Sequence, residues 1–225
     1  MAIADQISLI NKQLNDSKAR LIVVTKTRSV AELEETYRAG AIEFGENRVQ
    51  EMVEKQGLLP KDILWHQIGH LQTNKVKYIA PFVHLIHSVD SLNLLKEINK
   101  QGAKNNRVIN CLLQIYIATE ESKFGLDFAE ATSLLEDPSF AELLHIRIIG
   151  LMGMASFTED ENQIRKEFMS LADFFQKLKN NKTGASTGLV EWIELSMGMS
   201  GDYLIAAELG ATLVRVGSAI FGPRH

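Results

Sequence analysis

The feature that most constrains the fold is a regular alternation, along the whole chain, of short apolar runs with amphipathic helical patterns. Eight runs are rich in β-branched and other apolar residues, which is typical of strands. These runs are residues 20–24, 41–44, 63–68, 83–86, 108–117, 145–152, 191–195 and 212–216. Because the runs are almost continuously apolar, they indicate parallel strands that helices cover on both faces. The sequence therefore predicts an α/β fold.

The segments between the apolar runs carry signals for the start and end of helices. Ser29 and Glu32 have the spacing of a capping box, and Gly40 supplies a stop. Apolar residues at helical spacing between Ile3 and Leu14 predict a further helix before the first strand. Eight strand–helix units favour a closed (β/α)8 TIM barrel, although an open doubly wound sheet has the same periodicity. We expect residues 1–225 to form one barrel domain, since barrels commonly have about this length.

Composition and charge exclude several functional classes. The net charge of -4 and the lack of a basic run argue against a nucleic-acid partner. No apolar run approaches the roughly 20 residues that cross a membrane. The single cysteine, Cys111, lies in an apolar run without a nearby base, so we expect a buried hydrophobic residue and no nucleophile. One cysteine and an N-terminus that reads as a helix, with no secretory signal, predict a cytoplasmic protein.

Two histidine pairs have spacings that would suit zinc on a helix. His66 and His70 are four residues apart, and His84 and His87 are three apart. Both pairs are expected at strand ends, where this spacing has no special meaning, and no cysteine or carboxylate cluster accompanies them. We therefore expect no metal site, and we expect His66 to line a pocket instead.

The barrel prediction directs attention to the carboxyl ends of the strands, where barrels carry their functional residues. Lys26 lies two residues after the end of the first apolar run. Partial burial lowers the pKa of a lysine, and the neutral amine can form a Schiff base with an aldehyde. Position alone does not distinguish this role from that of a solvated lysine that ends the strand.

The loops after the seventh and eighth runs suggest a phosphate site. Residues 196–200 form a glycine-containing turn before a helix, and Gly217 and Ser218 begin another short turn. Free N–H groups at such turns bind anions, and barrels often bind phosphate there. Arg215 precedes Gly217 by two residues, so both face the same side of the strand. Arg215 could donate to a cofactor ring nitrogen, or pair with a carboxylate inside the barrel; the two turns could also be ordinary capped turns.

Seven sequence blocks, in order and over nearly the whole chain, carry a family resemblance. They are VVTKTRS (23–29), FGENRVQE (44–51), WHQIGHLQTNK (65–75), IHSVDS (86–91), EESKFGL (120–126), GLMGM (150–154) and LSMGMSGDYLIAAELGATLVRVGSAIFGPR (195–224). Together the blocks resemble the pyridoxal phosphate homeostasis protein family, single-domain relatives of the alanine racemase N-terminal barrel. The resemblance implies a protein that binds pyridoxal 5′-phosphate (PLP).

The resemblance assigns roles to particular residues. It makes Lys26 the Schiff-base lysine, turns Arg215 to the pyridine nitrogen, places Ser200, Gly217 and Ser218 at the phosphate, and places Asn47 and His66 near the ring. There are two departures from the family. Thr25 stands where the family often has serine, and Arg48 stands where it often has an aromatic residue. Thr25 keeps the hydroxyl, and neither change threatens cofactor binding.

The resemblance also bears on whether the protein is an enzyme. Related racemases take a tyrosine base from a second domain, which this sequence is expected to lack, and its tyrosines at 37, 78, 116 and 203 lie in helical or strand patterns. We therefore expect a non-catalytic, monomeric protein of vitamin B6 homeostasis that buffers PLP or delivers it to apoenzymes. The alternatives are a small PLP-dependent racemase or decarboxylase, and a cofactor-free Schiff-base aldolase. Lys75 and Lys123 are either secondary cofactor contacts or solvated lysines.

Overall fold

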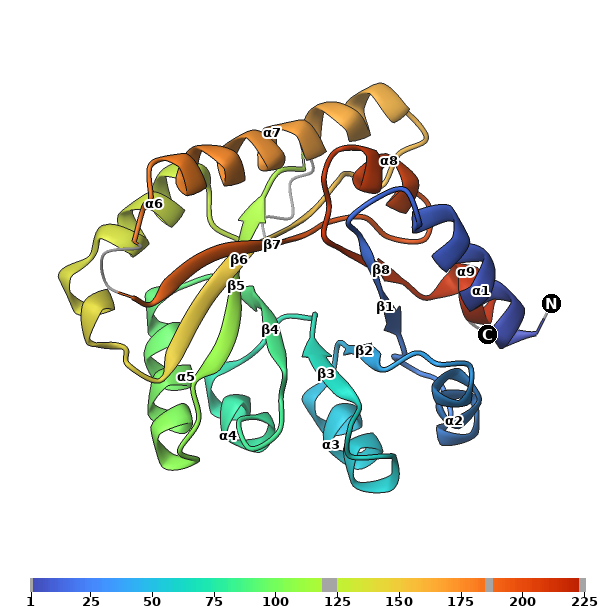
Figure 1. Ribbon diagram of the computed structural model, residues 1–225. Coiled ribbons are helices and arrows are strands. Elements are labelled where there is room, and N and C mark those ends of the chain that lie inside the picture. Colours follow the sequence, from blue (N-terminus) through green and yellow to red (C-terminus); the bar gives the residue numbers. More distant parts are fainter. Residues whose placement is uncertain (1, 119–124, 185–187, 223–225) are drawn as a thin grey trace.

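The fold is a closed barrel of eight parallel strands in sequential order (Figure 1). The computed structural model describes residues 2–118, 125–184 and 188–222. The strands are β1 (Arg20–Val24), β2 (Glu43–Glu46), β3 (Leu64–Gln67), β4 (Leu85–Val89), β5 (Ile109–Tyr116), β6 (Ile146–Met154), β7 (Val190–Ser196) and β8 (Leu213–Val216). β8 pairs with β1, so the sheet has no free edge. The predicted (β/α)8 barrel is confirmed, and the open-sheet alternative is wrong.

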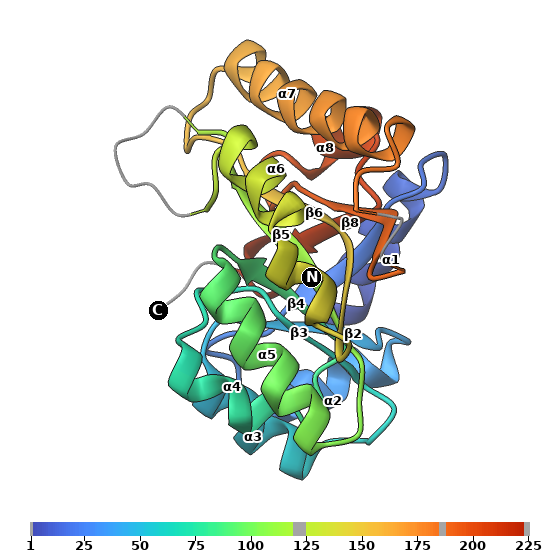
Figure 2. The ribbon, with the colours of Figure 1, turned by 90° about the vertical axis from the view of Figure 1, so that its left-hand side faces the viewer.

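Helices surround the barrel on the outside (Figures 1 and 2). They are α1 (Ile3–Leu14), α2 (Val30–Arg38), α3 (Val49–Leu58), α4 (Val76–Ile79), α5 (Leu92–Lys104), α6 (Phe128–Glu136), α7 (Glu161–Asn180), α8 (Tyr203–Glu208) and α9 (Ser218–Phe221), with 3₁₀ turns η1 (Thr73–Lys75) and η2 (Pro138–Glu142). The capping box of Ser29 and Glu32 is present at the start of α2. The predicted N-terminal helix α1 is also present, and it lies beside α9. None of the described helices has both the length and the apolar character needed to span a bilayer.

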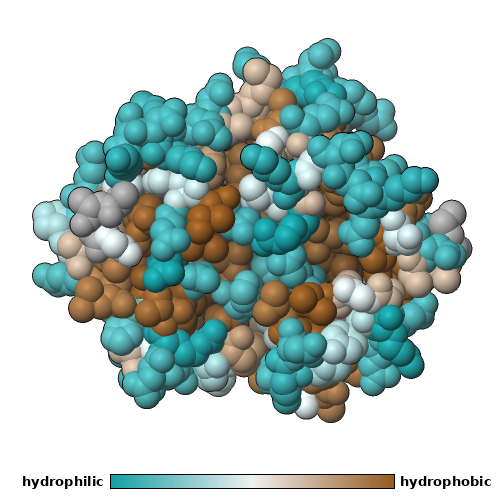
Figure 3. Space-filling model, in the orientation of Figure 1, coloured by the Kyte–Doolittle hydropathy of each residue, from teal (hydrophilic) through white to brown (hydrophobic). Residues whose placement is uncertain are grey.

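The core has two layers, as expected for this architecture. The larger layer lies between the strands and the helices, and the fully buried Phe168 of α7 belongs to it. Cys111 belongs to the same layer, and burial raises the pKa of its thiol, as expected for a small hydrophobic residue. Polar side chains cover much of the outer helices in the space-filling view (Figure 3). The smaller apolar layer, inside the barrel, consists of Ile22, Leu85, Leu112, Met152 and Leu213.

Two local details concern the strands of the barrel. A Cβ at Gly150 in β6 would lie 1.7 Å from the carbonyl oxygen of Glu194 in β7, and the pairing of these strands shifts register there. Only glycine permits this approach. β4 extends to Val89 and includes His87. The expectation that His87 follows the strand is therefore wrong, and its ring lies inside the barrel.

Candidate functional site

A cavity of ≈ 360 Å³ lies at the carboxyl ends of the strands. Its lining includes six of the seven residues that the sequence singled out, and these are Lys26, Asn47, Ser200, Arg215, Gly217 and Ser218. The six are far apart in the sequence, from Lys26 to Ser218. Barrel closure brings them together because parallel strands all end at the same face. His66 does not line this cavity.

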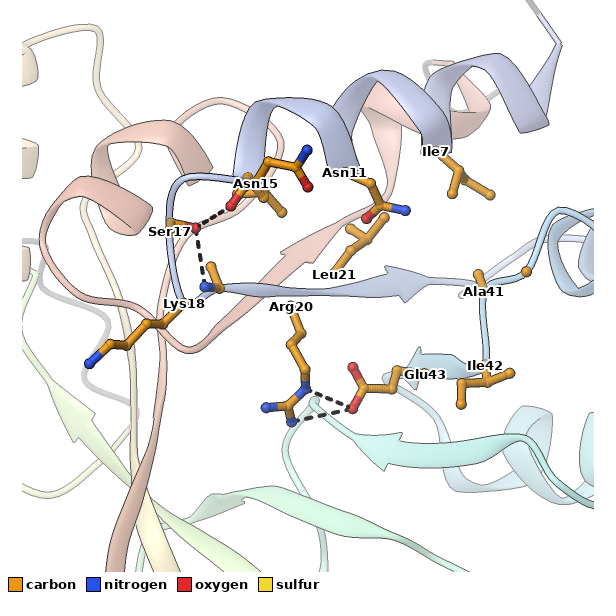
Figure 4. A pocket seen from close by; sticks show the side chains of 13 residues that line it. Ile7, Asn11, Asn15, Ser17, Lys18, Arg20, Leu21, Ala41, Ile42 and Glu43 are labelled. Carbon is orange, nitrogen blue, oxygen red and sulfur yellow. Dashed lines mark hydrogen bonds and ion pairs between the residues drawn. The ribbon is translucent and has the colours of Figure 1, made fainter.

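A larger cavity of ≈ 650 Å³ lies at the opposite end, between α1 and the starts of β1 and β2 (Figure 4). Two of its charged residues, Arg20 and Glu43, pair with each other at 3.3 Å, and Arg20 also pairs with Glu194 at 3.0 Å. The buried side-chain atoms without a hydrogen-bond partner, among the described residues, include Asn47 Oδ1 of the smaller cavity and none of the larger cavity. The smaller cavity is therefore the candidate site, since unpaired buried polar atoms call for a ligand.

Lys26 is half-buried and lies in a tight turn directly after β1. The N–H of Arg28 donates to the carbonyl of Thr25 at 3.1 Å, which closes the turn around Lys26. Thr27 has a positive φ of 63°, an uncommon conformation for a β-branched residue. Lys26 thus lines the cavity from a turn with an unfavourable backbone conformation. Such a conformation persists only where neighbouring residues hold it in place.

Arg215 lies on β8 and is only 4% exposed. Its Nη1 donates to Ser196 Oγ at 2.6 Å, and its Nη2 donates to the carbonyl of Gly153 at 2.9 Å. Burial lowers the pKa of Arg215 to about 10, while Asp202 acts in the opposite direction, so the guanidinium stays protonated at neutral pH. These bonds fix the guanidinium through neutral groups, and the carboxylate partner that the sequence left open is not among its hydrogen-bond partners in the described residues.

His66 lies below the cavity. Its Nδ1 is 3.0 Å from His87 Nε2, and His87 Nδ1 is 3.0 Å from Ser196 Oγ, which in turn accepts from Arg215. The expectation that His66 lines the pocket is not met, and strand geometry gives the reason. Successive residues on one face of a strand are two apart, and Ile68 is the residue of this face that reaches the cavity. His66 is therefore one layer deeper, where it supports Arg215 through two intermediates.

The loops after β7 and β8 converge at one wall of the cavity. Ser200 Oγ accepts hydrogen bonds from the N–H of Gly217 at 3.2 Å and of Ala219 at 3.3 Å. A Cβ at Gly217 would lie 3.1 Å from Val24 Cβ, so glycine lets the backbone lie close against β1. A hydroxyl and backbone amides at the start of a helical turn form a wall suited to a phosphate group.

A carboxylate that the sequence analysis missed also lines this wall. Asp202 is 9% exposed, and its Oδ1 accepts from the N–H of Met199 at 2.5 Å. Burial raises the pKa of Asp202, opposed by that hydrogen bond and by Arg215. Its side chain reaches back three residues to the Met199 N–H, which is the direction of the second bond of a capping box, and it makes no cap bond to the N–H groups of α8.

Asn47 lies in the loop directly after β2 and lines the same cavity. The amide of Gln67 donates to the carbonyl of Asn47 at 3.1 Å and to that of Gly69 at 3.0 Å, and these bonds hold the loop. Asn47 Oδ1 is buried and has no hydrogen-bond partner. A buried acceptor without a partner fits a ligand that offers it a hydrogen-bond donor. The residues present therefore fit a phosphorylated pyridine aldehyde.

The two secondary lysines have different outcomes. Lys75 ends η1, lies 5.8 Å from the centre of the Tyr78 ring, and does not line the cavity. Lys123 lies outside the described residues. No group of three or more potential metal-ligating side chains occurs in the part of the chain that the structure describes.

The barrel, the lysine after its first strand and the arginine on its last strand define a fold class. The family model described as "Alanine racemase, N-terminal domain" matches residues 1–225. The chain belongs, within that class, to the pyridoxal phosphate homeostasis protein family. The protein of that name from Aquifex aeolicus is 39% identical over 207 residues, which covers 92% of this chain and 87% of that protein. The protein of that name from Bos taurus is 37% identical over 215 residues, which covers 91% of this chain and 77% of that protein.

Solved structures agree with this assignment. PipY of Synechococcus elongatus with PLP bound is 33% identical and has a TM-score of 0.85, with 98% of this chain and 100% of that chain covered. PipY without PLP has a TM-score of 0.88. Alanine racemase from Bartonella henselae is 16% identical with a TM-score of 0.71, and 58% of that chain is covered. This last likeness shows the barrel fold alone.

Proposed function

We propose that this protein binds PLP as a Schiff base on Lys26 and acts in vitamin B6 homeostasis by buffering the cofactor or delivering it to apoenzymes. The observation that carries the proposal is the convergence of Lys26, Arg215 and the Ser200 wall on one cavity. A relative of 33% identity is described with PLP bound, which supports the same ligand here. Curated relatives carry the name pyridoxal phosphate homeostasis protein, which supports the same role.

Each residue has a role that follows from its chemistry. Lys26 would hold PLP through its amine, and the bound PLP would supply the aldehyde carbon, with water as the leaving group. Arg215 would face the pyridine nitrogen as a hydrogen-bond donor, and in contrast to a carboxylate it would not favour a protonated ring, so the ring would be a weak electron sink. Ser200 and Ser218 would hold the phosphate through their hydroxyls, together with backbone amides of the loop that begins at Gly217. Asn47 orients the ring, and His66 acts indirectly, through the hydrogen bonds below Arg215.

A carrier role, as opposed to catalysis, is part of the proposal. Racemisation needs a second base opposite the lysine. No tyrosine is among the described residues that line the cavity. The hydroxyl of Tyr37 donates to Asp62 and that of Tyr203 to Gln13, both away from it. Arg215 in place of a carboxylate also weakens carbanion chemistry. We extend the proposal to a single domain of residues 1–225 that acts as a cytoplasmic monomer, without nucleic-acid or membrane partners.

The test starts with the absorption spectrum of the purified protein, followed by borohydride reduction and peptide mapping. The expected result is a visible absorption band and a pyridoxyl adduct on Lys26, both lost in Lys26→Met and kept in Lys75→Met. A colourless protein that added PLP does not reconstitute would overturn the proposal and favour a cofactor-free aldolase. Turnover of amino acids above the background of free PLP would replace the carrier role with that of a small racemase or decarboxylase.

A further inference from the structure

A buried ammonium group lies directly beneath the turn that carries Lys26. Lys55 of α3 is 5% exposed. Its Nζ donates to Thr25 O at 2.7 Å, to Glu46 Oε1 at 2.7 Å and to Glu51 Oε1 at 2.6 Å. An ammonium has three N–H donors, and these three contacts use all of them. Lys55 is therefore a buried cation whose three N–H donors are all used by protein acceptors.

The same cluster holds the residues on both sides of Lys26. On one side, the Thr25 hydroxyl donates to Glu46 Oε1 at 2.7 Å while the Thr25 carbonyl accepts from Lys55. On the other side, the Thr27 N–H donates to Glu51 Oε1 at 2.5 Å. Three charge-assisted hydrogen bonds thus tie Thr25 and Thr27, the neighbours of Lys26 in the chain, to β2 and α3. Such bonds are the shorter and stronger ones in proteins.

The turn needs this support because its backbone conformation is unfavourable. Thr27 has a φ of 63°, which a β-branched side chain disfavours. Backbone of this kind persists only where the surroundings over-determine it. Glu46 is 0% exposed, so the cluster also holds a carboxylate away from water. The burial of these charges is costly, and the cluster bonds to both neighbours of Lys26 in the chain. This indicates a role at the Lys26 turn in addition to support of the fold.

We propose that Lys55, Glu46 and Glu51 are positioning residues that orient the Lys26 amine for covalent capture of an aldehyde. The inference rests on the proposed function of Lys26 and extends it to three residues outside the cavity. Positioning of a nucleophile acts on bond formation more than on the rest of ligand binding. Loss of the cluster therefore weakens covalent binding of PLP selectively, and leaves the phosphate wall intact.

The test compares two ligands on variants of the full-length protein. PLP forms the covalent bond, whereas pyridoxine 5′-phosphate has an alcohol in place of the aldehyde and binds without it. Glu51→Ala removes the acceptor of the Thr27 N–H at a partly exposed position, and Glu54→Ala is the matched control, because it removes the same charge from an exposed position of α3. A second variant, Lys55→Met with Glu46→Gln, removes the ammonium without leaving its fully buried carboxylate partner charged.

The expected result is that Glu51→Ala and the double variant lower the apparent affinity for PLP and the yield of the Lys26 adduct by about tenfold or more. Affinity for pyridoxine 5′-phosphate changes by less than about twofold, and Glu54→Ala changes neither quantity. Thermal unfolding confirms that each variant is folded; should the double variant not fold, Glu51→Ala alone decides. Equal loss for both ligands, or an unchanged adduct, overturns the inference. Absence of an adduct in the native protein would instead overturn the proposed function.

Discussion

Acidification should destabilise this protein through two histidines that the barrel buries in their neutral form. His66 and His87 are 0% exposed and contact each other at 3.0 Å. Burial lowers the pKa of both rings well below 6.5, with a further contribution from His84 for His66. For His87 the further contributions come from His66 and Arg215. The folded barrel therefore excludes protons that the unfolded chain accepts.

The direction and size of the effect follow from linkage. An unfolded histidine titrates near pH 6.5, so below that pH the unfolded state binds more protons and the free energy of unfolding falls. Above that pH both states are neutral at these rings, and the contribution is constant. Between about pH 7 and pH 5.5, a histidine that stays neutral in the folded state lowers the free energy of unfolding by about 1.3 kcal/mol. The two histidines together lower it by about 2.5 kcal/mol.

Urea unfolding at these two pH values measures the effect. The double variant His66→Gln/His87→Gln should be less stable at neutral pH, but should lose about 2.5 kcal/mol less than the native protein on acidification. His70→Gln is the matched control, because it removes a histidine whose side chain is 56% exposed and leaves the buried pair in place. Carboxylates titrate equally in all three proteins and cancel in the comparison. An acid-induced loss that is the same in the double variant and in the native protein would refute the reasoning.

Three further predictions concern the core and the cavity. Phe168→Ala should lower the free energy of unfolding by about 3–5 kcal/mol in urea, while Met169→Ala, 49% exposed on the same helix, should change it little. Arg215→Met removes the buried guanidinium and should weaken PLP binding about tenfold in an absorbance titration; unchanged affinity would contradict its assignment to the ring nitrogen. Gly217→Ala places a Cβ 3.1 Å from a side chain of β1 and should weaken PLP binding severalfold, whereas Gly57→Ala, which meets nothing within 4 Å, should not.

Most of the candidate site was predictable because its residues follow strands. Lys26 lies two residues after the first apolar run, and Gly217 directly follows the last run, which contains Arg215. Once a barrel is inferred, the ends of such runs are known to meet at one face. His66 shows the limit of this reasoning. The sequence shows which face of a strand a residue occupies, but the depth of that residue below the cavity depends on where the strand starts within the barrel.

The Lys55 cluster shows a second limit. In the sequence, Lys55 and Glu51 are an ordinary pair four residues apart on a helix. Such pairs are usually solvated, and nothing in the pattern distinguishes this one. Its burial arises because α3 lies against the Lys26 turn and Glu46 of β2. Sequence periodicity does not report that contact.

The sequence by itself determined the strands, the helices, their alternation and the parallel arrangement, because these depend on local periodicity and on apolar content that any reader of the chain can see. Its motifs also determined the family. Tertiary structure alone decided that the sheet closes, that Arg215 is held by Ser196 and Gly153, and that Lys55 is desolvated beneath Lys26. These outcomes depend on which distant segments exclude water from one another. Desolvation is a property of the packed barrel and of no segment taken alone.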